Sequence, residues 1–352
     1  MRYIVAMDSF KGSLTSEEAG KAVADNLKSH DEEAEIKVLS VSDGGEGMLD
    51  AFCKATHATR LSVATRDALM RRIEAQYAIT PDGTAIIEVA QACGLMHIEH
   101  EQRNPMRTTS YGVGLLVADA LRHNCHKMII GLGGSATSDA GIGMLRALID
   151  TFAPEDHFNA IRPLFDNCEV ILASDVTNPL YGINGAAHVF AKQKGATSSM
   201  IEALDARAKQ FALHTKRAMG FDKSMQPGAG AAGGLGYAFM QFLNAKMQSG
   251  AELLLHLLQF DKLLAHTDIV ITGEGKSDCQ TLMGKLPAVI MQHARQHHLP
   301  TLLLSGQIED RDSLITAGFK AACAVTPSDM PLEEAMIPEK AKANIRDFPL
   351  PI

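Results

Sequence analysis

Residues 3–13 have the sequence Tyr-Ile-Val-Ala-Met-Asp-Ser-Phe-Lys-Gly-Ser, a short apolar run followed at once by a polar loop that contains a glycine. The run is rich in strand-forming side chains and predicts a buried β-strand over Tyr3–Met7. Thr15, with Glu18 three residues later, predicts the start of a helix, because this spacing allows a capping box. The opening residues therefore predict a strand, a loop and a helix, the repeating unit of an α/β fold.

The same order recurs along the chain. A second strand is expected over Glu35–Val41, and a helix follows to about Ala55. Six further strands are predicted, most of them unbroken apolar runs: Ala85–Val89, Met128–Gly131, Val170–Ala173, Ile269–Thr272, Thr301–Leu304 and Ala321–Val325. Such runs are typical of parallel strands whose two faces are covered by helices. We therefore predict an α/β architecture with largely parallel sheets.

Chain length predicts two domains. The 352 residues exceed the roughly 250–300 at which a single core usually stops growing. The first two strand–helix units resemble the last three strands, so one domain is expected to be discontinuous. Residues 1–60 with 262–352 are predicted to form a Rossmann-like α/β domain, and residues 61–261 a second α/β domain.

Composition disfavours several classes of protein. The chain has 33 Lys and Arg against 41 Asp and Glu, a net charge of −8, which makes nucleic acid and anionic membranes poor partners. The six cysteines include no C-x-x-C element, so reduced thiols are favoured over a zinc site. The run at Tyr3–Met7 is too short for a signal peptide, and the uncharged stretch 227–245 contains five glycines and is expected to be a loop entering a helix. We expect a cytoplasmic protein.

Polar loops follow six of the predicted strands. They are rich in Asp, Gly, Ser and Glu: 8–13, 43–47, 131–139, 174–179, 273–278 and 305–307. In open α/β sheets ligands bind at the carboxyl ends of the strands, where glycines allow close backbone approach and helix N-termini attract anions. Several such loops with carboxylates among the glycines favour an enzyme that handles a phosphate and a metal ion.

Two familiar nucleotide motifs are incomplete. Gly273–Ser277 resembles the end of a P-loop, but the first glycine of that motif is replaced by Val270. Gly228, Gly230 and Gly233 fit G-x-G-x-x-G, but no strand precedes them. This glycine loop either is simply flexible or cradles a phosphate with its N–H groups, and the residues leave both interpretations open.

The charged residues of the loops also allow two interpretations. Asp43 and Glu46, which precede a helix, can hold Mg²⁺ or accept a proton, or they can compensate the helix N-terminus. Residues 43–47 contain three glycines, more than a helix cap needs, which favours the functional interpretation. Asp8 and Lys11 taken alone are more simply a surface turn than a phosphate site, and 175–179 can be a turn.

Seven motifs occur in a fixed order: 8–13 (DSFKGS), 43–47 (DGGEG), 133–137 (GGSAT), 175–179 (DVTNP), 193–196 (QKGA), 227–236 (PGAGAAGGLG) and 271–275 (ITGEG). With them the chain resembles the type I glycerate kinases of bacteria, a two-domain α/β family, from residue 1 to about 335. The resemblance implies ATP-dependent phosphorylation of D-glycerate, with 2-phosphoglycerate favoured over 3-phosphoglycerate as the product. It also implies ATP and Mg²⁺ as cofactors and an active site in the interdomain cleft.

Candidate residues lie within these motifs. Asp175 or Asp8 is expected to accept the hydroxyl proton, and Lys11 and Lys285 to bind phosphate or carboxylate. The candidates for substrate binding are Ser9, Ser135, Thr137, Asn178 and Lys285. Backbone donors to the nucleotide are expected at Gly133, Gly134, Gly228, Gly230, Gly233, Gly234, Gly273 and Gly275. The candidates for the metal are Asp43, Glu46 and Asp278.

The chain departs from the family pattern in three places. Lys276 stands where the family usually has Arg, and 65–70 (TRDALM) replaces a Thr-Gly-Pro-Leu-Gly turn. The tail 337–352 lacks the long final helix of the family, which would leave an apolar face exposed.

Other functions fit the same residues. A kinase for another small hydroxy acid, such as tartronate, is not distinguished by sequence. A non-catalytic sensor of an acid or nucleotide would need to have lost the chemistry, yet every candidate carboxylate and lysine is present. A phosphatase would use similar phosphate contacts, and ATP dependence separates it. The sequence does not indicate an oligomeric state.

Overall fold

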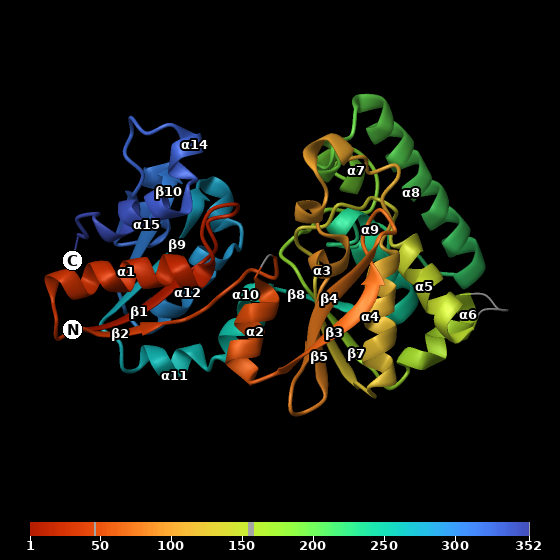
Figure 1. Ribbon diagram of the computed structural model, residues 1–352, viewed down its shortest axis with the longest axis horizontal. Helices are drawn as coiled ribbons and strands as arrows, with labels where there is room; N and C mark the ends of the chain where they lie inside the picture. The colour runs from red at the N-terminus through yellow and green to blue at the C-terminus, as the bar shows by residue number, and fades with distance from the viewer. Residues whose placement is uncertain (46, 154–157, 352) are drawn as a thin grey trace. The chain divides into compact units, whose positions relative to one another are not determined.

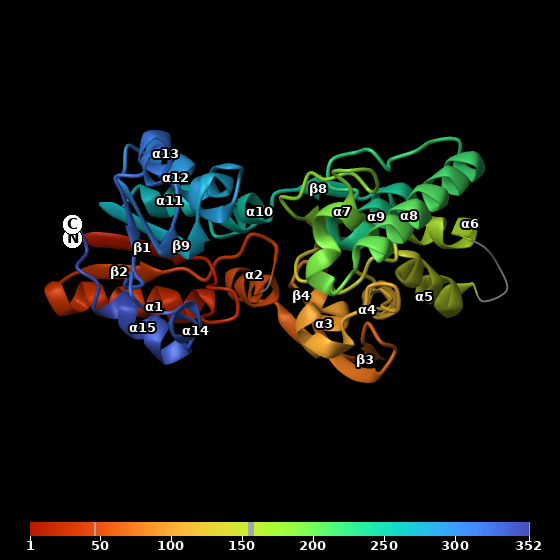
Figure 2. The same ribbon diagram turned by 90° about the horizontal axis from the view of Figure 1, so that it is seen from above.

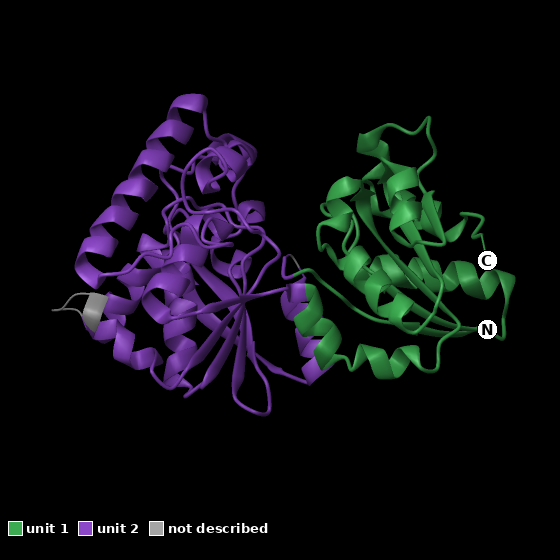
Figure 3. Ribbon diagram, turned by 180° about the vertical axis from the view of Figure 1, so that it is seen from behind, with its two compact units in different colours: residues 1–43, 251–352 green, residues 44–250 purple. Residues whose placement is uncertain are grey.

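The computed structural model describes residues 1–45, 47–153 and 158–351. Its residues form two compact units, unit 1 (1–43 and 251–352) and unit 2 (44–250), coloured separately in Figure 3. These units differ from the predicted domains because α2 (Met48–Thr56) packs on strands of unit 2. The domain boundaries at 60/61 and 261/262 stay a prediction.

Unit 1 is built on a five-stranded parallel sheet in the order β2-β1-β9-β10-β11 (Figure 1). The strands are β1 (Arg2–Met7), β2 (Glu35–Val38), β9 (Ile269–Ser277), β10 (Thr301–Ile308) and β11 (Ala321–Ala324). Its helices are α1 (Ser16–His30), α10 (Gly250–Leu257), α11 (Phe260–Leu264), α12 (Leu286–Gln296), α13 (Arg311–Ala317), α14 (Leu332–Ala335) and α15 (Pro338–Arg346), with the short η5 (Cys279–Leu282). The capping box predicted at Thr15 and Glu18 is confirmed at the start of α1.

Both faces of this sheet are covered. Figure 2 shows α1 and α15 on one side of the unit 1 sheet and α12 and α13 on the other. Leu302 and Leu304 of β10 belong to the buried cluster that includes Val23 of α1. Leu303 points the other way and belongs to the cluster of Met291 of α12. Alternate residues face opposite layers of helices, which explains why 302–304 is an unbroken apolar run.

Unit 2 contains a six-stranded mixed sheet in the order β3-β4-β5-β6-β7-β8. The strands are β3 (Thr59–Arg66), β4 (Arg72–Ile79), β5 (Thr84–Glu88), β6 (Lys127–Gly131), β7 (Glu169–Ala173) and β8 (Lys246–Gln248). β3, β4 and β5 are joined antiparallel, and β5 to β8 are parallel. The prediction of two α/β units with largely parallel sheets is confirmed.

The helices of unit 2 bury one large apolar cluster against this sheet. They are α2, α3 (Ala90–Cys93), α4 (Tyr111–Arg122), α5 (Ile142–Phe152), α6 (Phe158–Ile161), α7 (Ala186–Phe190), α8 (Ser198–Met219) and α9 (Ala231–Leu243), with the short η1 (Leu95–His97), η2 (His100–Gln102), η3 (Arg162–Phe165) and η4 (Lys192–Lys194). None of the helices in the described ranges is both long and apolar enough to cross a membrane. All six cysteines are free, as predicted, and four of them are buried.

Two predicted loops are strand for much of their length. β9 continues to Ser277 and β10 to Ile308, because Lys276 pairs with Gln307 and Ser277 pairs with Ile308. The prediction of loops over 273–278 and 305–307 is therefore wrong for these residues. The extension positions the side chains that follow the sheet.

The departures at 65–70 and in the tail are accommodated within their own units. The buried Asp67 carboxylate accepts the N–H groups of Leu69 (2.9 Å) and Arg71 (2.8 Å) and so closes the turn. The tail forms the nine-residue helix α15, in which Ile345 is buried. Asn26 Nδ2 of α1 donates to the carbonyl oxygen of Ile345 at 2.9 Å. α15 packs on α1 and covers part of the apolar surface, whereas Leu332, Met336 and Ile337, which precede α15, are exposed.

Candidate functional site

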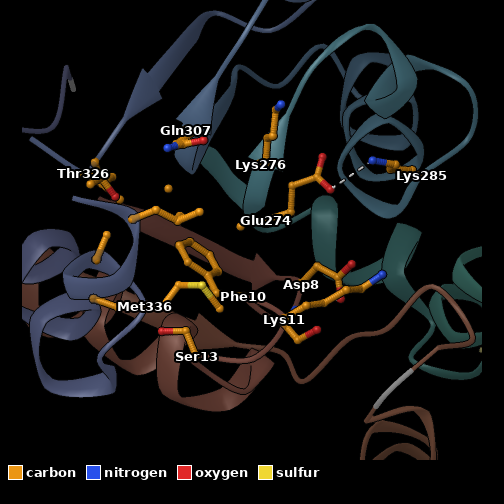
Figure 4. Close-up of a pocket in the computed structure, with 17 residues that line it drawn as sticks. Asp8, Phe10, Lys11, Ser13, Glu274, Lys276, Lys285, Gln307, Thr326 and Met336 are labelled. Atoms are coloured by element: carbon orange, nitrogen blue, oxygen red, sulfur yellow. Dashed lines mark hydrogen bonds and ion pairs between the residues drawn. The ribbon is translucent and has the colours of Figure 1, made fainter. Parts of the chain in front are cut away.

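A pocket lies at the carboxyl ends of the unit 1 strands. From β1 the chain first adds β2 on one side of the sheet and later adds β9, β10 and β11 on the other, so a topological switch point lies between β1 and β9. In doubly wound sheets, ligands bind outside the carboxyl ends of the strands at such a point. The cavity has a volume of about 380 Å³ and is drawn in Figure 4. It is lined by residues that follow β1 and β11, by the ends of β9 and β10, and by α14 with the residue after it.

Asp8 is the buried carboxylate of this pocket. It follows β1, is 4% exposed, and its Oδ1 accepts the N–H of Ser9 at 2.8 Å. Burial, followed by the negative charge of Asp43, raises the pKa of Asp8 to about 8, although Lys11 opposes the shift. Lys11 Nζ lies 3.9 Å from Asp43 Oδ2. Three residues chosen from sequence are thus brought together around one buried carboxyl group.

Glu274 is a second buried carboxylate, and the sequence analysis did not select it. Its Oε1 accepts the hydroxyls of Ser277 (3.0 Å) and Thr281 (2.6 Å), and Lys285 Nζ lies 3.7 Å from Oε2, the dashed contact of Figure 4. Its negative charge also contributes to the raised pKa of Asp8. The available signal was a carboxylate between two glycines at the end of an apolar strand.

The pocket has a charged side and an apolar side. In Figure 4, Asp8, Lys11, Glu274 and Lys285 gather on one side, and Phe10 lies beside Met336 on the other. The hydroxyl oxygens of Ser9 and Ser13, which line the pocket, are shielded from solvent and have no hydrogen-bond partner among the described residues. A bound molecule could supply that partner.

A second group of predicted residues lies in unit 2, where loops meet at the ends of β6 and β7. A Cβ atom on Gly133 would lie 2.3 Å from Gly45 Cα, so this position requires glycine. Lys194 Nζ donates to Ser135 Oγ (3.1 Å) and to the carbonyl oxygen of Thr137 (2.7 Å). The loop predicted to bind an anion is therefore tied to a buried ammonium group.

Lys194 belongs to the motif 193–196 (QKGA), although it is not among the predicted site residues. It is 3% exposed, and burial lowers the pKa of its ammonium to about 8, although the negative charge of Asp139 opposes the shift. At pH 7 the group still carries its proton. Its partners Ser135 and Thr137 are 59 and 57 residues away in sequence, so these contacts could not be predicted from the sequence alone.

The glycine loop of unit 2 has a packing role. Gly233 has a φ of +66°, and a Cβ atom there would lie 1.9 Å from the carbonyl oxygen of Thr137. Similar close contacts apply to Gly228, Gly230 and Gly234, whose added Cβ atoms would lie under 3 Å from neighbouring atoms. These contacts favour the structural interpretation of the loop, and a phosphate cradle over Gly228–Gly234 stays a prediction.

Two further predicted glycines lie in unit 1 and differ from each other. A Cβ atom on Gly273 would lie 1.6 Å from the carbonyl oxygen of Leu304, so the sheet itself requires this glycine. At Gly275 the nearest atom would be Phe10 Cα at 3.5 Å, an ordinary contact, and Gly275 lines the pocket. The fold therefore does not require glycine at 275.

The remaining predicted residues are placed as follows. Asp175 and Asn178 lie in the loop after β7 of unit 2, and Asn178 Nδ2 donates to the carbonyl oxygen of Asn184 at 2.9 Å. Gly134, with a φ of +69°, lies beside Ser135. Asp278 caps η5, because its Oδ1 accepts the N–H of Gln280 at 2.8 Å. Glu46 lies outside the described residues.

The carboxylates of the pocket suit a metal ion that arrives with a ligand. Within the described ranges, no three His, Cys, Asp or Glu side chains are grouped so that they could hold a metal by themselves. Mg²⁺ usually takes one or two carboxylates and completes its shell with water and phosphate oxygens. Asp8, whose pKa is raised by burial and by Asp43 and Glu274, lies where an added cation would offset the crowded negative charge.

Comparisons with known proteins agree with one another. The model of the glycerate kinase family matches residues 3–349. A glycerate kinase of Halalkalibacterium halodurans is 35% identical, with 97% of this chain and 96% of that protein covered. A glycerate 2-kinase of Escherichia coli is 36% identical, with 95% and 93% covered.

A solved structure extends the likeness to the fold. A crystal structure from Salmonella typhimurium LT2 that carries the name glycerate kinase 2 has a TM-score of 0.78 and 34% identity, with 98% of this chain and 95% of that chain covered. The chain belongs to the glycerate kinase family and is a kinase, a phosphotransferase that acts on an alcohol group.

Proposed function

We propose that this chain transfers the γ-phosphoryl group of ATP, bound with Mg²⁺, to D-glycerate and forms 2-phosphoglycerate. The name of the Escherichia coli relative, glycerate 2-kinase, supports the position of transfer. The observation that supports the chemistry most is the unit 1 pocket, where Asp8 is buried beside the cations Lys11 and Lys285. Phosphoryl transfer depends chiefly on positioning and on balancing the charge of the phosphate oxygens.

Asp8 is our candidate for the group that accepts the hydroxyl proton. A general base works best when its pKa lies near the working pH, and the pKa of Asp8 is raised to about 8. Only the ionised form of Asp8 can accept the proton, so the active fraction of this base grows as the pH rises toward 8. Asp175 in unit 2 is the alternative. Lys11 and Lys285 supply positive charge for the phosphate.

Asp43, which pairs with the pocket residue Lys11, and Glu274, which lines the pocket, are our candidates for the carboxylates that face Mg²⁺. Glu46 and Asp278 are the further candidates from sequence. When bound, the ion would neutralise charge on the phosphoryl oxygens. The hydroxyls of Ser277 and Thr281 orient Glu274 for this role.

The loop 133–137 of unit 2 is our candidate for the glycerate carboxylate. Ser135 Oγ accepts a hydrogen bond from Lys194, which leaves the hydroxyl proton of Ser135 to donate to an anion. The charge of Lys194 raises the local potential for the same anion. Thr137 and Asn178 are further candidates in this unit.

Phosphorus NMR of a mixture of protein, MgATP and D-glycerate tests the proposal. We expect ADP and 2-phosphoglycerate, and loss of turnover in excess EDTA that added Mg²⁺ restores. A 3-phosphoglycerate signal would correct the position of transfer. Turnover of tartronate but not D-glycerate would correct the substrate. Binding of ATP and glycerate with no ADP formed would favour a sensor and overturn the kinase proposal.

A further inference from the structure

The apolar side of the unit 1 pocket is not explained by glycerate. It is formed by Phe10 after β1, Val325 after β11, and Leu332, Ala335 and Met336 at α14. Glycerate has three carbons, a carboxylate and two hydroxyls, so it offers almost no apolar surface to such a wall. Part of the pocket therefore matches a ligand group that the acid substrate lacks.

The exposure of these side chains also indicates a bound partner. Phe10 and Val325 are buried, whereas Leu332 is 60% exposed and Met336 is 40% exposed. Large apolar side chains that stand open beside a formed cavity are typical of binding surfaces. The cavity volume of about 380 Å³ lies in the range of small-molecule sites, roughly 300–1,000 Å³.

The charged side restricts what that partner can be. Lys11, Lys276 and Lys285 line the same cavity as two carboxylates, Asp8 and Glu274, and Lys276 also pairs with Glu309 at 2.7 Å. The lining lysines outnumber the lining carboxylates, and an excess of positive charge suits a polyanion. Gln307 and Thr326 line it as well, and their side chains can both donate and accept hydrogen bonds. A ligand with a flat apolar part, hydrogen-bonding edges and a polyanionic tail fits all of these features.

We propose that the unit 1 pocket is the nucleotide site, with the base of ATP between Phe10, Leu332 and Met336 and the phosphates toward Lys11 and Lys285. This assignment rests on the proposed function, in which ATP is the phosphoryl donor. It gives the acid no place in the apolar half and agrees with a carboxylate site at Ser135 in unit 2. Gly275, which has no packing reason to be glycine, lies beside the path of the nucleotide.

Calorimetry with ATP and with inorganic triphosphate separates the two halves of the pocket. Leu332→Glu and Met336→Glu place a charge against the base, so we expect each to weaken ATP binding and raise KM for ATP by about tenfold or more. Their affinity for inorganic triphosphate, which has no base, and their KM for glycerate should stay near those of the wild type. Lys285→Met should weaken both ATP and triphosphate.

Ile337→Glu is the matched control. Ile337 is 48% exposed, follows Met336 in sequence and is not among the residues that line the cavity. Ile337→Glu adds the same negative charge outside the cavity. If ATP binding is unchanged in this variant, the losses in Leu332→Glu and Met336→Glu are due to their place in the pocket. Unchanged ATP affinity in Leu332→Glu and Met336→Glu, with a raised KM for glycerate, would overturn the nucleotide assignment and leave the kinase proposal intact. ATP binding as expected, with no turnover in the wild type, would overturn the kinase proposal instead.

Discussion

At the scale of single residues, Asp8 provides the sharpest test of the proposed chemistry. A buried carboxyl whose pKa is about 8 is an effective proton acceptor only if the substrate hydroxyl reaches it. Asp8→Asn keeps the shape and removes the base, so we expect kcat to fall by about 100-fold or more. Steady-state kinetics with saturating MgATP and D-glycerate measure the effect.

Asp175→Asn is the control for this prediction. Asp175 lies in the other unit and was the first candidate for the same role. A near-normal kcat for Asp8→Asn, with a large loss for Asp175→Asn, would move the proton acceptor to unit 2.

Lys194 carries a buried charge, and we expect this charge to contribute to glycerate binding more than to the stability of the fold. Its two hydrogen bonds favour the folded state, but the cost of burying an ammonium group opposes them. Methionine has a similar length, so Lys194→Met should change Tm little and raise KM for glycerate by about tenfold, the value of one charged hydrogen bond. Thermal unfolding and steady-state kinetics measure the two effects.

Lys194→Arg is the companion variant. The Lys194 side chain is 3% exposed, and the planar guanidinium of arginine is larger than the ammonium group buried there. We therefore expect Lys194→Arg not to restore glycerate binding. A marked fall in Tm for Lys194→Met with an unchanged KM would show that the residue only supports the fold.

At the scale of elements, His293 joins three helices of unit 1. From α12, its Nδ1 lies 2.8 Å from Asp261 Oδ1 of α11, and its Nε2 lies 3.0 Å from Glu252 Oε2 of α10. His297 Nε2 also lies near Asp261, at 3.5 Å, and Phe260 meets the His293 ring edge-on. Burial lowers the pKa of His293, but the hydrogen bonds to Asp261 and Glu252 outweigh it, and the net pKa is raised above its usual 6.5.

This arrangement predicts a pH-dependent contribution to stability. Because the pKa is raised by folding, the contribution is fully present below about pH 6.5 and is lost as the pH rises through the folded-state pKa. His293→Gln should therefore be destabilised at pH 6 by about 1 kcal/mol, since both carboxylates are half exposed, and less so at pH 9. Urea unfolding at the two pH values measures it. An equal loss at both values would contradict a charged role for the ring.

Strands with two covered faces could be predicted from sequence. Of the more exposed strands, β2 lies within the predicted 35–41, but β3, β4 and β8 were not predicted. β1, β6 and β7 are short apolar runs buried among helices, and each was expected within a residue or two. β3 and β4 alternate charged and apolar residues, with exposed positions such as Arg60 and Glu74, and no apolar run marks them. β8 has three residues at the sheet edge, too few for a pattern.

The residues of the candidate site also fall into those that could be predicted from sequence and those that could not. Asp8, Lys11 and Lys285 could be predicted because each lies in the polar segment that follows an apolar strand. The carboxyl ends of parallel strands lie at the same edge of a sheet. Lys194 could not be selected, because its importance depends on partners that folding brings together from 57 and 59 residues away. Glu274 could have been selected, because it lies between two glycines at the end of an apolar strand. Gly230 and Gly233 show the converse, since glycines expected to bind phosphate meet backbone atoms of neighbouring loops.

At the scale of the whole molecule, the candidate groups are shared between the two units. Asp8, Lys11 and Lys285 belong to unit 1, and Asp175, Ser135 and Lys194 to unit 2. Transfer requires the reacting atoms to approach to about 3–3.5 Å, so both substrates must be bound before transfer can occur. The chain passes between the units twice, at 43/44 and 250/251, and Gly44 has a φ of +94°, a conformation suited to glycine.

Closure of the molecule on its two substrates follows from this division. Because each substrate is assigned to a different unit, we expect ATP or D-glycerate alone to change the radius of gyration little and both together to reduce it. Small-angle scattering of the Asp8→Asn variant, whose turnover is expected to be about 100-fold slower or more, measures the change. Lys194→Met at the same concentrations is the control, since weaker glycerate binding should reduce the compaction. Superimposable curves with and without both ligands, at concentrations where calorimetry shows both bound, would contradict closure.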